Sequence, residues 1–180
     1  MSFPQWFAGQ VITAERLNAR NVHEVLQSQD QEASSTSYVM SEIQVEFEPD
    51  ATYMYWCYIS YTADYRNGLR WTWSGTGTTL GSFTQAMAHD ASGATGQNAS
   101  REVIFRRPAN TTDRQAGGTS LLSGASPVSV VQSAYDQGTL FTSGGTPTLN
   151  LMFGRWADGV GQNTILRGGN QTRFLYQRIA

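Results

Sequence analysis

Residues 53–63, YMYWCYISYTA, constrain the possible folds more than any other part of this sequence. Apolar or aromatic side chains occupy both the odd and the even positions of the stretch. Alternation with a period of two predicts a β-strand, and a strand that is apolar on both faces is typical of a central strand covered on both sides. Residues 38–48 alternate as well and place Ile43, Val45 and Phe47 on one face, which predicts a second strand.

Further strands are predicted at residues 69–74, within 79–88, and at 101–107, 128–135, 148–155, 163–167 and 171–179. The pair Asn67-Gly68 is a tight-turn signal and predicts a hairpin between residues 53–63 and 69–74. A second turn is predicted at Gly168-Gly169, between the last two strands. About eight or nine short strands bounded by turns predict a mainly β protein, an antiparallel jelly roll or β-sandwich.

The first 30 residues follow a different pattern. Residues 1–12 predict an arm with apolar anchors, and Thr13 is placed to cap a helix over residues 14–29. The apolar side chains of this helix are too few to stabilise it alone in water, so it is expected to pack against another chain. The predicted parts are the arm and helix (1–30), a polar linker (31–37) and the β-sandwich (38–180). The anchors of the arm are Phe3, Trp6, Phe7, Val11 and Ile12, and the apolar residues of the helix are Leu17, Val22, Val25 and Leu26.

Composition excludes several classes of function. The net charge of −2 offers no basic surface for a nucleic-acid backbone, and no apolar run approaches the roughly 20 residues that span a bilayer. The N-terminus lacks the basic and apolar regions of a signal peptide, so the protein is expected to start in a cytoplasm. All 12 basic residues are arginine, which excludes lysine-dependent sites such as a P-loop. The single cysteine, Cys57, is expected to be a small buried hydrophobe.

No catalytic motif, metal site or cofactor site is predicted. Paired carboxylates for glycan hydrolysis would have to come from among Glu42, Glu46, Glu48, Asp64 and Glu102, and the sequence does not test their separation. The neighbouring aromatics Trp56, Trp71 and Trp73 fit two interpretations, a platform for stacking sugars or core plus subunit interface. The second is favoured, because large aromatics supply much of the area buried in cores and interfaces.

The arm carries a resemblance to a known group of proteins. Residues 6–18, WFAGQVITAERLN, closely resemble the opening of many small structural proteins of tailed phages. The shared pattern is an aromatic residue, then A-G-x-V/I-hydrophobic-T-A-x-x-hydrophobic-N. Such proteins are frequent in phages of high-GC actinobacteria, which fits a sequence without lysine. The ending, residues 164–179, looks like the last hairpin of the TNF-like jelly roll that many of these proteins carry.

The resemblance implies a non-enzymatic virion protein, assembled in the host cytoplasm and expected to be a homotrimer. The arm would bind other virion proteins, and the helix residues would gather copies around a three-fold axis. A place at the tail tip or on a fibre is slightly preferred, with residues 109–127 and 154–163, including Trp156, facing the host surface and its glycans. The alternative is a decoration or minor capsid protein on the head. A cell-wall glycan hydrolase and a carbohydrate-binding module remain less favoured alternatives.

Overall fold

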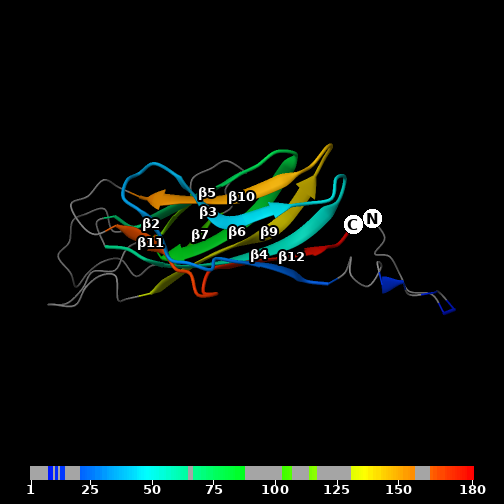
Figure 1. The fold of residues 1–180 in the computed structure, drawn as a ribbon, viewed down its shortest axis with the longest axis horizontal. Coiled ribbons are helices and arrows are strands. Elements are labelled where there is room, and N and C mark those ends of the chain that lie inside the picture. The colour runs from blue at the N-terminus through cyan, green and yellow to red at the C-terminus, as the bar shows by residue number, and fades with distance from the viewer. Residues whose placement is uncertain are drawn as a thin grey trace.

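The computed structural model describes residues 8–9, 11, 13–14, 21–64, 67–87, 103–106, 114–116, 131–156 and 163–180. These residues form a mainly β protein, as predicted (Figure 1). The strands are β1 (His23–Leu26), β2 (Gln31–Ala33), β3 (Val39–Glu46), β4 (Thr52–Thr62), β5 (Leu69–Ser74), β6 (Thr78–Met87), β7 (Val103–Arg106), β8 (Arg114–Ala116), β9 (Gln132–Thr142), β10 (Thr148–Arg155), β11 (Thr164–Leu166) and β12 (Arg173–Arg178).

Strands β3 to β10 form a jelly roll. One sheet has the order β3-β10-β5-β8, and the other contains the order β4-β9-β6-β7. Consecutive strands alternate between the two sheets except at the β6–β7 pair, and all the pairings are antiparallel. This arrangement is the double Greek key of a jelly roll, and it confirms the predicted fold class.

Four further strands widen the second sheet beyond β4, to eight strands. β12 and β11 pair one after the other with the same edge of β4, and β1 and β2 pair in turn with β12 and β11. The predicted hairpin at Gly168-Gly169 is therefore wrong, because the two strands that it was to join lie in line instead of side by side. The Arg167 N–H donates to the Ser60 carbonyl (2.8 Å) and Thr172 bonds to the same residue, so only the residues between them loop out.

The helix predicted over residues 14–29 is wrong from His23 onward, because β1 occupies that segment. Its residues pair with β12 in the register Val25 to Phe174 and Leu26 to Arg173. Pairing with β12 satisfies the backbone of this segment and packs Val25 against the core, which a thin amphipathic stripe in water cannot do. β2 lies within the segment predicted as a linker, and its Ala33 is fully buried.

The hairpin predicted at Asn67-Gly68 is also wrong. The turn exists, with the Asp64 carbonyl accepting from both N–H groups and Gly68 at a φ of 55°. However, β4 and β5 lie in different sheets, since β5 pairs with β10 and β8. A turn signal identifies a reversal of the chain, and the jelly roll uses this reversal to cross between sheets.

One core lies between the two sheets. The inward residues of β4 alternate along Tyr53–Tyr61 and meet inward residues of β5, β10 and β12. Cys57 is buried among them as a free thiol, as predicted. The largest fully buried side chains are Trp71, Tyr55, Tyr61, Phe153, Phe174, Ile43, Ile59, Leu69, Leu140, Leu149 and Leu151.

Candidate interaction surfaces

Both ends of the described chain lie at one end of the sandwich, here called the proximal end. The Thr52 N–H donates to the Ala180 carbonyl (2.7 Å), and β1 begins where His23 pairs with Tyr176. Figure 1 shows the C-terminus at this end, on the right. The arm therefore joins the sandwich at its proximal end.

The opposite, distal end collects other strand termini. β6 ends there at Met87, β9 begins there at Gln132 and β10 ends there at Arg155, as their pairing with neighbouring strands shows. The connections β6–β7, β8–β9 and β10–β11 thus all start and finish at the distal end. The jelly-roll topology places the arm and these three connections at opposite ends of the molecule.

The structure describes only part of the predicted arm and helix. Val11 is 76% exposed, and Ala8, Gly9, Thr13 and Ala14 are exposed as well. Val22 is exposed, while Val25 and Leu26 belong to β1. The remaining predicted residues, Phe3, Trp6, Phe7, Ile12 and Leu17, lie outside the described residues.

The outward surface of the eight-stranded sheet carries a continuous apolar patch, called here the apolar face. Met54 (41% exposed) and Tyr58 (40%) project from β4, and Tyr135 (38%) and Phe141 (46%) project from β9. Tyr58 and Tyr135 are cross-strand partners, with ring centroids 5.6 Å apart and ring planes at 89°. The half-buried Trp56 and its partner Leu175 on β12 complete the patch. The sequence predicts β4 to be covered on both faces, whereas the structure leaves Met54 and Tyr58 on its outward face exposed.

The three tryptophans considered for sugar stacking separate into two environments. Trp71 and Trp73 are buried in the core, and both indole N–H groups donate to Asp136 Oδ2, at 3.1 and 2.8 Å. Only Trp56 lies on the apolar face. These positions confirm the core interpretation for Trp71 and Trp73 and exclude a platform built from all three rings.

Asp136 was not identified from the sequence, although among the described residues it is the one carboxylate that is buried in the core. It lies on β9 with no exposed surface, and its Oδ1 accepts from the Tyr55 hydroxyl at 3.0 Å. Tyr55 lies on β4 and the two tryptophans lie on β5, so the Asp136 carboxylate binds side chains from both sheets. A charged residue within an alternating strand gives no sequence signal for this role, because the donors lie 63 to 81 positions away.

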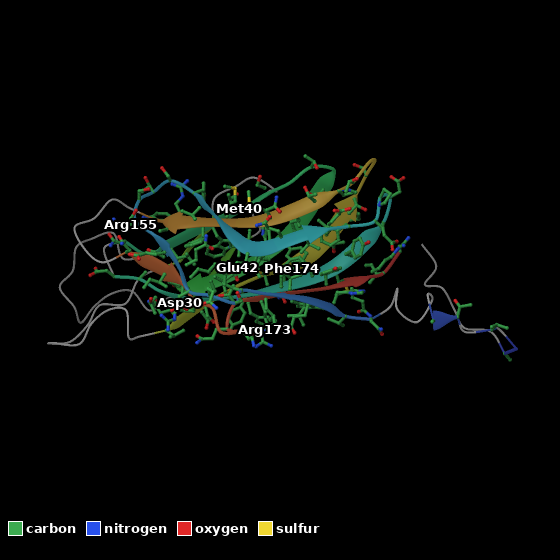
Figure 2. The ribbon with its side chains drawn as sticks, in the orientation of Figure 1. Asp30, Met40, Glu42, Arg155, Arg173 and Phe174 are labelled. Atoms are coloured by element: carbon green, nitrogen blue, oxygen red, sulfur yellow. The ribbon has the colours of Figure 1, made fainter. Side chains whose placement is uncertain are left out.

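Two of the five carboxylates considered for catalysis, Glu42 and Glu48, bind structural partners. Glu42 accepts from the backbone N–H and the hydroxyl of Ser28, and these bonds, the backbone one first, lower the pKa of Glu42. Glu48 pairs with Arg178, and Glu102 lies outside the described residues. Within the described ranges, no three His, Cys, Asp or Glu side chains gather where they could hold a metal ion. Figure 2 shows Glu42 at the side of the sandwich, near Asp30.

Trp156 is half-buried at the distal end, directly after β10. Its backbone N–H donates to the Asn67 carbonyl at 2.8 Å. The adjacent Arg155 is buried and donates to Ser34 O and Asn67 Oδ1, at 2.7 and 2.8 Å, which ties the β2–β3 and β4–β5 connections to the end of β10. Of the two loops predicted to face the host, the structure describes only residues 114–116, 154–156 and 163.

Similarity to known proteins is found among solved structures. No family model and no curated protein matches the chain. Among solved structures, the chain is similar to the VP2 protein of infectious bursal disease virus in T=1 particles, with 12% identity, a TM-score of 0.24, and coverage of 100% of this chain and 41% of that one. A VP2 subviral particle of that virus is similar at 9% identity and a TM-score of 0.21, over 89% and 38%. The chain thus spans about two fifths of these proteins, and such low TM-scores carry no argument about function.

One finding bears on membranes. In the part of the chain that the structure describes, no helix is long and apolar enough to cross a bilayer.

Proposed function

We propose that this chain is a non-enzymatic structural protein of a phage virion, anchored to the particle by residues 1–12 with its β-sandwich facing outward. The observation that carries the proposal is the arm pattern at residues 6–18, joined to a jelly roll at the end opposite to its longer connections. An anchoring element and an outward element need to lie apart, and this topology separates them.

The exposure of the arm supports an intermolecular role. Val11 would be expected to bury its side chain if the arm folded back onto its own sandwich, yet it is the most exposed large hydrophobic residue described. Twelve extended residues reach about 40 Å, which is enough to enter a neighbouring subunit. We propose that Phe3, Trp6, Phe7, Val11 and Ile12 bury their side chains there.

Within the virion, a place at the tail tip or on a fibre is our preferred assignment, because the resemblance of the arm is mostly to tail-associated proteins. Residues 109–127 and 154–163, with Trp156, would then face the host envelope and its glycans. The other assignment is a decoration protein on the head, where the same arm would bind capsomers. The homotrimer expected from the resemblance loses its proposed contact, because Val25 and Leu26 belong to β1 instead of a helix.

The anchoring role is tested by replacing Phe3, Trp6 and Phe7 with serine in the phage genome. The variant is expected to fold, with an unchanged Tm, and to be missing from purified particles. Met40→Ser is the control. Met40 lies on β3 of the four-stranded sheet, is 44% exposed and is far from the arm in the sequence. Incorporation of the arm variant at the wild-type level would show that the arm is not the anchor.

The location is tested by labelling intact particles with an antibody against residues 109–127. Gold at the tail end would identify a tail protein, and gold distributed over the head would identify a decoration protein. Absence of the protein from purified particles by mass spectrometry would refute the virion assignment altogether.

A further inference from the structure

The apolar face lies on the central strands of its sheet, where exposed aromatic side chains are least expected. β4 and β9 have neighbours on both sides in the eight-stranded sheet. Their inward residues fill the core, while the outward Met54, Tyr58, Tyr135 and Phe141 each keep 38 to 46% of their surface exposed. An apolar patch of a few hundred Å² is about the largest that a folded monomer usually exposes, and such a patch is often functional.

The face is free of charge. The outward positions of β4 and β9 contain no Asp, Glu, Lys or Arg; they are Thr52, Met54, Trp56, Tyr58, Ser60, Ser133, Tyr135, Gln137, Thr139 and Phe141. The nearest charges on the flanking strands, Arg173 and Glu24, already pair with each other at 3.2 Å. A partner can therefore cover this face without leaving any charge buried and unpaired.

The geometry of the rings favours a protein partner over a sugar. A sugar ring stacks on a flat aromatic surface, but Tyr58 and Tyr135 meet edge to face, at 89°. Together with the flexible Met54, they form an uneven apolar surface. Such a surface packs against side chains that interdigitate with it, as in the contact between two sheets.

The size of the face fits the centre of a subunit interface. Three strands about 4.8 Å apart, over about nine residues of 3.4 Å each, cover roughly 400 Å². A standard interface buries about 800 Å² on each partner, with an apolar core and a polar rim. The uncharged polar residues around the face, among them Ser60, Ser133 and Gln177, supply such a rim.

We propose that a second copy of this chain covers the apolar face, with the two eight-stranded sheets packed face to face. The partner surface has to be apolar and uncharged, with side chains that interdigitate with those of the face, and the chain itself carries such a surface. The outward surface of the four-stranded sheet is not such a surface, because its strand β3 presents two charged residues there, Glu42 and Glu46. Two antiparallel sheets pack about 10 Å apart with their strands within about 30° of each other, which lets the same residues meet their own copies.

The test is sedimentation velocity of the full-length protein between about 1 and 100 µM, a range suited to micromolar association. The wild type is expected to be a dimer. Tyr58→Glu is expected to weaken the dimer at least about a hundredfold, because it buries a carboxylate from each copy where the only adjacent cation among the described residues, Arg173, already pairs with Glu24. Met40→Glu places the same charge at a similarly exposed side chain of the four-stranded sheet. This variant should form dimers like the wild type. Circular dichroism and Tm establish that each variant is folded.

Three results would overturn the proposal: a wild type that stays monomeric at about 100 µM, a folded Tyr58→Glu variant that pairs like the wild type, or a trimer. A monomer whose Tyr58→Glu variant is lost from particles would assign the face to a different virion protein. If Tyr58→Glu does not fold, the double variant Tyr58→Ser and Phe141→Ser removes the apolar side chains without burying charge, and it should also be monomeric. The sedimentation results do not depend on whether the protein is part of a virion, so failure of this proposal and failure of the proposed function are distinguishable.

Discussion

The two sheets of this sandwich share one core but present different surfaces to the outside. On the four-stranded sheet, β3 alternates buried residues with the exposed Met40, Glu42, Gln44 and Glu46. On the eight-stranded sheet, β4 alternates equally buried residues with Met54, Trp56 and Tyr58. Since both strands fill the core with every second residue, the contrast lies entirely in residues that the core does not need. An apolar outward face therefore requires a separate reason, and burial against another chain supplies one.

The largest difference in stability is expected between variants of two tryptophans, one in the core and one on the outward face. Trp71 is fully buried, whereas Trp56 is half-buried on the apolar face. Trp71→Ala is expected to lower the free energy of unfolding by about 3–5 kcal/mol through the lost contacts and the cavity left behind. Trp56→Ala should cost about 1 kcal/mol in the monomer. Urea denaturation of both variants measures the two changes in the free energy of unfolding. Equal losses would mean that the outward face contributes to folding stability as much as the core does.

The next largest effect is expected at the carboxylate that links the two sheets. Asp136→Ala leaves the Tyr55 hydroxyl and two indole N–H groups buried without their acceptor. The expected loss in the free energy of unfolding is about 3 kcal/mol. Gln137→Ala, one residue further on the outward side, should stay within about 0.5 kcal/mol of the wild type. Similar denaturation midpoints for the two variants would contradict the role assigned to Asp136.

A moderate effect is expected at the sheet edge where the N- and C-terminal strands run together. A Cβ atom at Gly168 would lie 2.2 Å from the Gln29 backbone, whereas at Gly169 it would meet nothing within 4 Å. Gly168→Ala should cost about 1–3 kcal/mol by overpacking. Gly169→Ala should cost about 1 kcal/mol, because φ is 60° there. Thermal unfolding of both variants measures the difference, and the reverse order would show that this edge is loosely packed.

The smallest effect is expected on the polar outer surface, at Glu42. Hydrogen bonds from Ser28 hold its pKa below the ordinary value of 4.5. A depressed pKa in the folded state means that the carboxylate stabilises the protein above the pKa of the unfolded state. This stabilisation is lost as the pH falls through the lower folded value. In a series of Tm measurements at decreasing pH, Glu42→Gln should show a shallower decline below pH 4.5 than the wild type. Met40→Gln, at an exposed position of β3 that carries no titratable group, should decline like the wild type.

The alternation of apolar and polar residues predicted individual strands well, because it depends only on residues close together in the sequence. Residues 148–155 were predicted and form β10, and β6 lies within the predicted interval 79–88 except for its first residue, Thr78. The same reasoning identified Cys57 as buried and the fold as an antiparallel sandwich. These features depend on neighbours along the chain, which a sequence pattern records directly.

Pairings over long distances could not be predicted in the same way. Asn67-Gly68 and Gly168-Gly169 were correctly identified as turns, but neither one joins two strands that pair with each other. Asp136 lacked any local signal, because its donors come from other strands. The apolar residues of the candidate interface on β4 were visible in the sequence, while Tyr135 and Phe141 joined them only through the register of β9.

The sequence by itself determined the alternation of the strands, the chemistry of each face of β3 and β4, and the uncharged, apolar character of the arm. Tertiary structure decided which sheet each strand joins, and it made a strand of residues 23–26 where their apolar spacing fits a helix. The physical reason is that a short segment with few apolar side chains has little preference of its own. An unsatisfied edge at β12 offers it backbone hydrogen bonds and a place in the core for Val25, and this gain exceeds the weak local tendency toward a helix.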